Sequence, residues 1–112
     1  MTSVFQVIEP TGILDGTKTK DFHHQINKTI ETDAQIVLID FKNVTFMDSS
    51  GLGALVKALK TLNAAGVQLF LCSINEQIRI LFELTSMERY FSICSDREEF
   101  EQHLKKQEMV EL

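Results

Sequence analysis

Two short apolar runs separated by a helical stripe restrict the fold of this chain more than any other feature. Residues 36–39 (IVLI) and 67–72 (VQLFLC) have the length and apolar content of buried strands. Between them, apolar side chains recur at helical spacing: Leu52, Leu55, Val56, Leu59 and Leu62. A strand, a helix and a second strand in this order predict a right-handed crossover and parallel pairing.

Further helices are expected on both sides of this unit. Apolar residues recur at every fourth position between residues 17 and 32, which predicts an amphipathic helix there; they are Phe22, Ile26 and Ile30. Gly66 is expected to end the helix over residues 52–62 as a C-terminal cap.

Two matches to the capping-box pattern predict the last two helices. Ser73 precedes Glu76 by three residues, and Ser95 precedes Glu98 by the same spacing. Each pair opens a helical stripe, with Ile78, Leu81 and Phe82 in the first and Phe100 and Leu104 in the second. A short strand is expected between them, around residues 91–94.

The N-terminal segment predicts one or two strands before the first helix. Residues 4–8 alternate like an edge strand, and Pro10 separates them from the segment TGILDG at residues 11–16. These strands could pair antiparallel at the sheet edge. The whole chain, residues 1–112, is expected to be one α/β domain with a largely parallel sheet and a frayed, solvated tail from about residue 106.

Composition excludes several classes of function. The formal net charge is −5 and the basic residues are scattered, so a phosphate-backbone binder of nucleic acid is not expected. No apolar run is long enough to cross a membrane and no export signal opens the chain, which favours the cytoplasm. Cys72 and Cys94 are then expected to be reduced thiols. His23 and His24 are adjacent instead of one helical turn apart, so no metal site is predicted.

The segment MDSSGLG, residues 47–53, is the candidate functional site. It joins a predicted strand to a predicted helix, at the sheet edge where functional groups of such folds gather. Asp48, Ser49 or Ser50 could cap the helix, and a structural cap needs only one of them. Gly51 and Gly53 are expected to leave the backbone open to close approach from outside.

Besides a simple helix cap, three kinds of chemistry are possible at this segment. A phosphate-binding loop would need a Gly-Lys-Ser/Thr sequence, which is missing. A nucleophile elbow needs small residues two positions before and after the serine, and neither Ser49 nor Ser50 has both. His23, His24 and His103 are the possible bases, but no triad is indicated, so no catalytic residue is predicted. Phosphorylation of a serine would suit the free N–H groups of a helix N-terminus.

The run VLIDFKNVTFMDSSGLGAL, residues 37–55, closely resembles the signature of STAS-domain proteins, specifically the bacterial anti-sigma-factor antagonists. The resemblance implies a small mixed, largely parallel sheet of four to five strands with about four helices packed mainly on one face. It also implies that the serine directly after the aspartate, Ser49, is the phosphorylated residue, with Ser50 as second choice. Asp15, in GILDG at residues 12–16, matches the N-terminal element of the family.

The same resemblance implies a non-catalytic switch protein without a cofactor that takes part in transcription regulation. Its expected partners are an anti-sigma factor that is also a serine protein kinase and a PP2C-type phosphatase. The residues expected to contact a partner are Asp15, Asp48, Ser50, Gly51, Leu52 and Gly53. A β-branched side chain at position 51 is expected to weaken this binding more than folding. The alternative function is a small-ligand or nucleotide-binding STAS sensing module.

Overall fold

The computed structural model describes residues 5–111, and the side chains as far as residue 107. Its main sheet has four strands in the order β1 (Phe5–Ile8), β3 (Ile36–Asp40), β5 (Gln68–Cys72) and β6 (Ser92–Cys94). A second sheet pairs β2 (Gly12–Leu14) with β4 (Val44–Met47). All of these pairings are parallel, so the expected antiparallel pairing of the N-terminal strands is wrong. Strand β1 runs in the same direction as its neighbour β3, and β2 runs in the same direction as β4.

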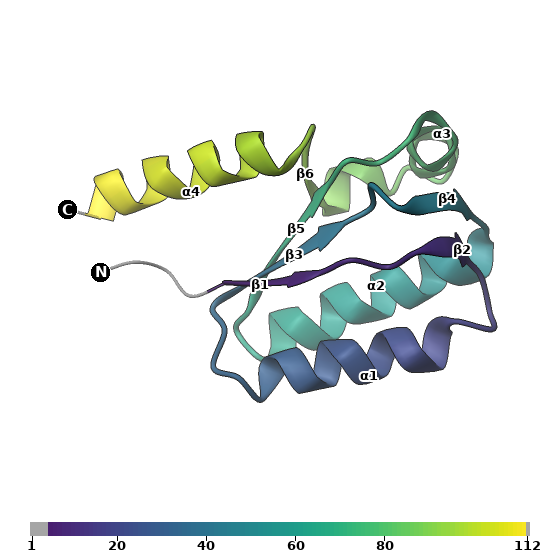
Figure 1. Ribbon diagram of the computed structural model, residues 1–112, viewed down its shortest axis with the longest axis horizontal. Helices are drawn as coiled ribbons and strands as arrows, with labels where there is room; N and C mark the ends of the chain where they lie inside the picture. Colours follow the sequence, from purple (N-terminus) through teal and green to yellow (C-terminus); the bar gives the residue numbers. More distant parts are fainter. Residues whose placement is uncertain (1–4, 112) are drawn as a thin grey trace.

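Four helices surround the sheets, as predicted (Figure 1). Helices α1 (Thr19–Ile30) and α2 (Ser49–Ala64) lie side by side below the main sheet, and α4 (Arg97–Glu111) lies on its opposite face. Helix α3 (Glu76–Leu84) lies beside β4, and a short 3₁₀ helix, η1 (Glu88–Tyr90), follows it. None of the described helices combines the length and apolarity needed to span a membrane.

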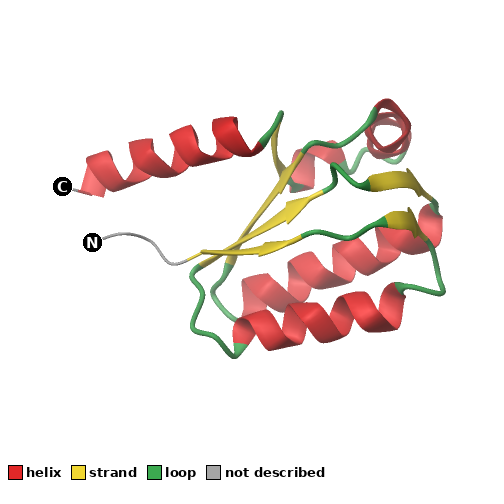
Figure 2. Ribbon diagram, in the orientation of Figure 1, coloured by secondary structure: helices red, strands yellow, loops and turns green. Residues whose placement is uncertain are grey.

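Helices lie on both sides of the main sheet (Figure 2), and the central strand β3 is buried along its whole length, which explains its uninterrupted apolar sequence. Val37 and Ile39 belong to the larger core, together with residues of α1, α2 and α3. Leu38 belongs to a smaller core under α4, in which the ring of Phe100 meets the ring of Phe70 at 5.3 Å. The helices therefore pack mainly on one face, as predicted, and α4 alone covers the other.

Gly66 ends α2 as a C-terminal cap, as predicted. This residue has φ 75°, and its N–H donates to the carbonyl of Asn63 at 3.1 Å. The N–H of Val67 donates to the carbonyl of Leu62 at 2.9 Å, which completes a Schellman C-cap.

The two predicted capping boxes are wrong in their residues, although both helices exist. Ser73 has a left-handed backbone with φ 60°, and Asn75 caps α3 by accepting from the N–H of Ile78 at 2.9 Å. At α4, the carboxylate of Asp96 accepts from the N–H of Glu99 at 2.8 Å. The expected pairs therefore lie two residues too early at α3 and one residue too early at α4, because Asn75 and Asp96 take the capping role.

Helix α4 continues to Glu111 through a segment that favours helix and lacks glycine and proline, and fraying from about residue 106 stays a prediction. Strand β4 was missed, because Val44–Met47 follows β3 after only three residues and its two exposed positions, Thr45 and Phe46, are adjacent and do not alternate.

Candidate functional site

The pairing of β2 with β4 brings the two sequence motifs together. Leu14 lies opposite Met47 in the register of this small sheet. Asp15 and Asp48 directly follow these two strands, so they lie at the same end of the small sheet. The N–H of Asp48 also donates to the carbonyl of Leu14 at 3.4 Å.

Asp48 is the residue that caps α2. Its backbone is extended, and its carboxylate accepts a hydrogen bond from the N–H of Gly51 at 2.9 Å. Its carbonyl accepts from the N–H of Leu52 at 3.0 Å. Because Asp48 satisfies these donors, neither serine hydroxyl is needed for the cap.

Ser49 and Ser50 are the first two residues of α2, and both are exposed. They differ in their neighbours: a Cβ atom placed on Gly16 would lie 3.7 Å from the Cβ of Ser50 and 3.8 Å from its Oγ. The turn after β2 therefore stands beside Ser50. Across residues 5–111, no histidine is hydrogen-bonded to either serine; His23 lies 3.3 Å from the carbonyl of Ala54, and His103 packs against Phe70.

Gly51 is required by close packing within the protein. An added Cβ atom would lie 2.2 Å from the carbonyl oxygen of Leu14 and 3.0 Å from Cγ of Met47. The expectation that Gly51 leaves the backbone open is therefore wrong, and the overlap argues against the expected small cost to folding of a side chain there. Leu52 is also buried, with 6% of its surface exposed. Gly53 is exposed and has open space around it, as expected of a site of close approach.

Asp15 orders the turn between β2 and α1. Its carboxylate accepts from the N–H of Thr17 at 2.9 Å and from the Thr17 hydroxyl at 2.6 Å. These bonds, and to a smaller degree the charge of Lys18, hold the pKa of Asp15 below its ordinary value of 3.8. The Asp15 carboxylate is thus an ordered negative group at the same end of the small sheet as Asp48.

Two amide side chains that sequence reasoning missed close the free edge of β4. Gln77 accepts from the N–H of Met47 at 2.9 Å and donates to its carbonyl at 2.7 Å, as a neighbouring strand would. Asn75 donates to the carbonyls of Val44 and Thr45. Asn75 is the N-cap of α3 and Gln77 lies in its first turn, and no sequence signal shows that their amides also bind β4.

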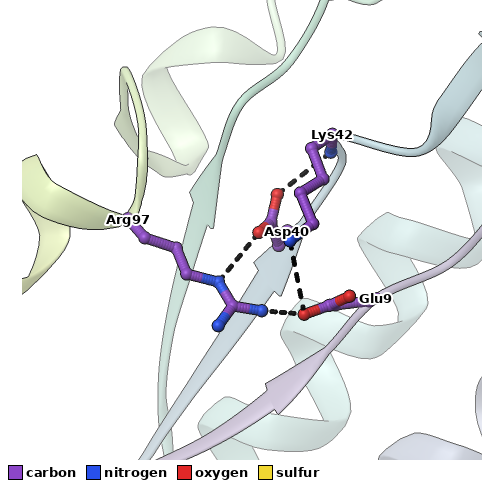
Figure 3. Close-up of polar contacts among 4 residues, drawn as sticks. All are labelled: Glu9, Asp40, Lys42 and Arg97. Carbon is purple, nitrogen blue, oxygen red and sulfur yellow. Dashed lines mark hydrogen bonds and ion pairs between the residues drawn. The ribbon is translucent and has the colours of Figure 1, made fainter.

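A polar cluster at the carboxyl ends of β1 and β3 has a structural role (Figure 3). Asp40, only 1% exposed, accepts from Nε of Arg97 at 2.9 Å and from the N–H of Lys42 at 3.0 Å. Arg97 also pairs with Glu9. Arg97 binds both carboxylates of the cluster, those of Glu9 and Asp40, so the cluster holds α4 against the sheet.

Cys72 and Cys94 lie opposite one another on β5 and β6, and both are free, buried thiols, as expected. Burial raises the pKa of both thiols, that of Cys72 to about 11, with a further contribution from the charge of Asp40. Neither thiol has the lowered pKa of a nucleophile.

The family model described as STAS domain matches residues 2–100. The chain is a member of the STAS domain family. The STAS chain is 28% identical over 83 residues to an anti-sigma-B factor antagonist of Staphylococcus aureus, covering 74% of this chain and 77% of that one. It is 26% identical over 82 residues to an anti-sigma F factor antagonist of Paenibacillus polymyxa, covering 72% and 70%.

Among solved structures, the STAS fold described here is similar to the anti-sigma factor antagonist SpoIIAA in its unphosphorylated form. The TM-score is 0.72 at 21% identity, covering 91% of this chain and 90% of that chain. SpoIIAA has also been solved in a phosphorylated form, with a TM-score of 0.67 and coverage of 91% and 93%. At this identity the likeness shows a shared fold.

Proposed function

We propose that this STAS domain is an anti-sigma-factor antagonist whose binding to its partner is switched by phosphorylation of Ser49. The observation that carries the proposal is the division of roles at the start of α2. Asp48 caps the helix, and the exposed Ser49 hydroxyl at the first helical position is left without a structural task. The names of the curated relatives support the antagonist role.

The start of α2 suits a phosphoryl group. Among the described residues, the cap bonds engage the N–H groups of Gly51 and Leu52 and leave those of Ser49 and Ser50 without an acceptor. Such N–H groups and the helix dipole stabilise a phosphate. The phosphate would also add about −1.5 to −2 charges beside Asp48. Within the domain, the N–H groups and the helix dipole would therefore stabilise the phosphate, whereas the charge of Asp48 would repel it.

A docked partner would respond more strongly than the fold. Leaving an unpaired charge in a docked surface costs on the order of 2–5 kcal/mol, or roughly thirty-fold to several-thousand-fold in Kd. In the free domain the same charge faces water. Phosphorylation should therefore release the partner while the fold remains intact. The alternative function as a small-ligand or nucleotide-binding sensing module has less support, because the relatives named above are antagonists.

The partners proposed for this cycle are an anti-sigma factor with serine kinase activity and a PP2C-type phosphatase. In this cycle the kinase supplies the catalytic groups and ATP, so the STAS domain acts as substrate and ligand and not as an enzyme. Ser50, Gly53, Asp48 and Asp15 are proposed to line the contact around Ser49. The burial of Gly51 and Leu52 gives these two residues an indirect role through the backbone.

Phosphopeptide mapping after incubation with the purified kinase and Mg-ATP tests the site. We expect label on Ser49 in the wild-type protein and in Ser50→Ala, none in Ser49→Ala, and loss of label on addition of the PP2C-type phosphatase. Label on Ser50 with Ser49 unmodified would contradict the assignment. Equal affinity of the kinase for the modified and unmodified forms, measured by calorimetry, would contradict the switch.

A further inference from the structure

An apolar surface adjoins the candidate site on the side of β4. Five large apolar side chains are exposed in the described part of the chain, and four of them lie on β2, β4 and α3: Ile13 (51%), Phe46 (45%), Ile80 (42%) and Leu84 (80%). These four residues are called the β4–α3 surface below. So many exposed apolar groups on neighbouring elements indicate an interaction site.

The β-sheet half of this surface ends two residues before Asp15 and Asp48 of the candidate site. Ile13 and Phe46 are register partners, so their side chains stand next to each other on the outer face of the small sheet. The next residues, Leu14 and Met47, turn into the core and are 3% and 0% exposed. Asp15 and Asp48 follow immediately, and Ser49 is the next residue along the chain.

The helical half meets β4 at Gln77. On α3, Ile78 and Phe82 face the core, whereas a groove of about 480 Å³ runs along the outer side, lined by Glu76, Gln77, Ile80, Leu81 and Leu84. Gln77, which lines this groove, is hydrogen-bonded to both the N–H and the carbonyl of Met47. The groove therefore begins beside the residue that follows Phe46, and α3 lies next to β4 in the fold (Figure 1).

The charges around the surface indicate the chemistry of its occupant. Arg79 pairs with both Glu76 and Glu83 along α3. Along α3 this gives two carboxylates against one cation, and the adjoining candidate site adds Asp15 and Asp48 against Lys18. An apolar surface with an acidic rim suits a partner that presents apolar side chains flanked by Lys or Arg. A second copy of this chain would bring like charges together.

We infer that the β4–α3 surface is a docking site for the protein kinase that modifies Ser49, and that it holds the kinase through apolar contacts away from the reacting hydroxyl. This inference rests on the proposed function. Since the contact does not touch the acceptor, its loss should raise KM for phosphorylation and leave kcat unchanged.

The test uses the full chain and the purified kinase that labels Ser49. Leu84→Asp is the main variant, because its side chain is the most exposed of the four and its replacement should not unfold the protein; circular dichroism checks this. Tyr90→Asp is the matched control, since Tyr90 is 57% exposed but lies on η1, outside the surface. We expect Leu84→Asp to weaken binding by about ten-fold or more and to raise KM by a similar factor. Tyr90→Asp should stay within about two-fold of wild type.

The outcomes separate this inference from the proposed function. If the wild-type protein is not labelled at Ser49, the proposed function fails. If the wild type is labelled and Leu84→Asp binds equally well, only the docking site fails. Ile80→Asp should repeat the result of Leu84→Asp, and wild-type affinity in that variant counts against the surface. A dimer in analytical ultracentrifugation of the protein alone that Leu84→Asp dissociates would make a second copy the occupant and overturn the kinase assignment.

Discussion

Arg97, the first residue of α4, donates from Nε to the carboxylate of Asp40, the last residue of β3, at 2.9 Å. The arginine is partly exposed, whereas the aspartate is almost completely buried. Asp40 also accepts from the backbone N–H of Lys42 at 3.0 Å, and the Cys72 thiol lies next to its carboxylate. The pair is therefore the main polar link between α4 and the sheet.

We expect Arg97→Met to lower the free energy of unfolding by about 1–3 kcal/mol, because the buried carboxylate would lose its charged partner. Urea denaturation measures this. Arg79→Met is the control, since Arg79 forms only exposed pairs and should change stability by about 0.5 kcal/mol or less. Adding Asp40→Asn to Arg97→Met should recover part of the loss; equal losses in the two arginine variants would contradict this account.

Replacing Gly51 by Ala should destabilise the fold, because the new methyl group would overlap the Leu14 carbonyl. Overpacking of this kind costs about 1–3 kcal/mol. Gly53→Ala is the matched control two residues away: its methyl group meets open space, and the gain in helix propensity should stabilise the protein by up to about 1 kcal/mol. Thermal and urea denaturation compare the two. A neutral Gly51→Ala would show that β2 can move away from α2.

The Cys72 thiol should resist alkylation in the folded protein at pH 8. Burial raises its pKa to about 11 from an ordinary value of 9.0, so the folded state retains the proton more strongly than the unfolded state. The corresponding contribution to stability is fully present below pH 9 and is lost as pH rises toward about 11. Cys72→Ser should flatten the fall in stability over this range. Rapid labelling of native Cys72 with iodoacetamide would contradict the prediction.

The carboxyl group of Asp15 should titrate below 3.8 in an NMR experiment, because the N–H and hydroxyl of Thr17 donate to its charged form. A depressed pKa in the folded state means that its contribution to stability is present above pH 3.8 and is lost as pH falls through the folded pKa. Thr17→Ala removes the hydroxyl and should move the pKa partway back toward 3.8. An unchanged titration in this variant would assign the shift to the backbone N–H alone.

Features that depend on local sequence could be predicted. Periodicity located α1 from Phe22 and Ile26, apolar runs located β3 and β5, and a glycine located the end of α2. The candidate site does lie at a strand-to-helix junction, as predicted, but the strand before Ser49 is β4 and not the predicted strand β3. These features need only the chain near each residue.

The remaining features depend on contacts between distant segments. The role of Gly51 is set by the carbonyl of Leu14, and the edge of β4 is completed by Gln77 from α3. Neither contact leaves a pattern in the residues around it. The parallel pairing of β1 with β3 likewise depends on how the chain crosses the sheet, which alternation within β1 alone cannot reveal.

The region around Ser49 becomes ordered only when β2 has paired with β4. These two strands are separated along the chain by a whole helix and strand, and the turn carrying Asp15 reaches Asp48 only after both strands have paired. A nascent, truncated or damaged chain would contain the sequence DSSGLG without the paired strands β2 and β4 beside it. An enzyme that recognises these paired strands would therefore pass over incomplete molecules, and a short DSSGLG peptide would be a poor substitute for the whole domain. Modification of Ser49 would then also report that the molecule had reached its native state.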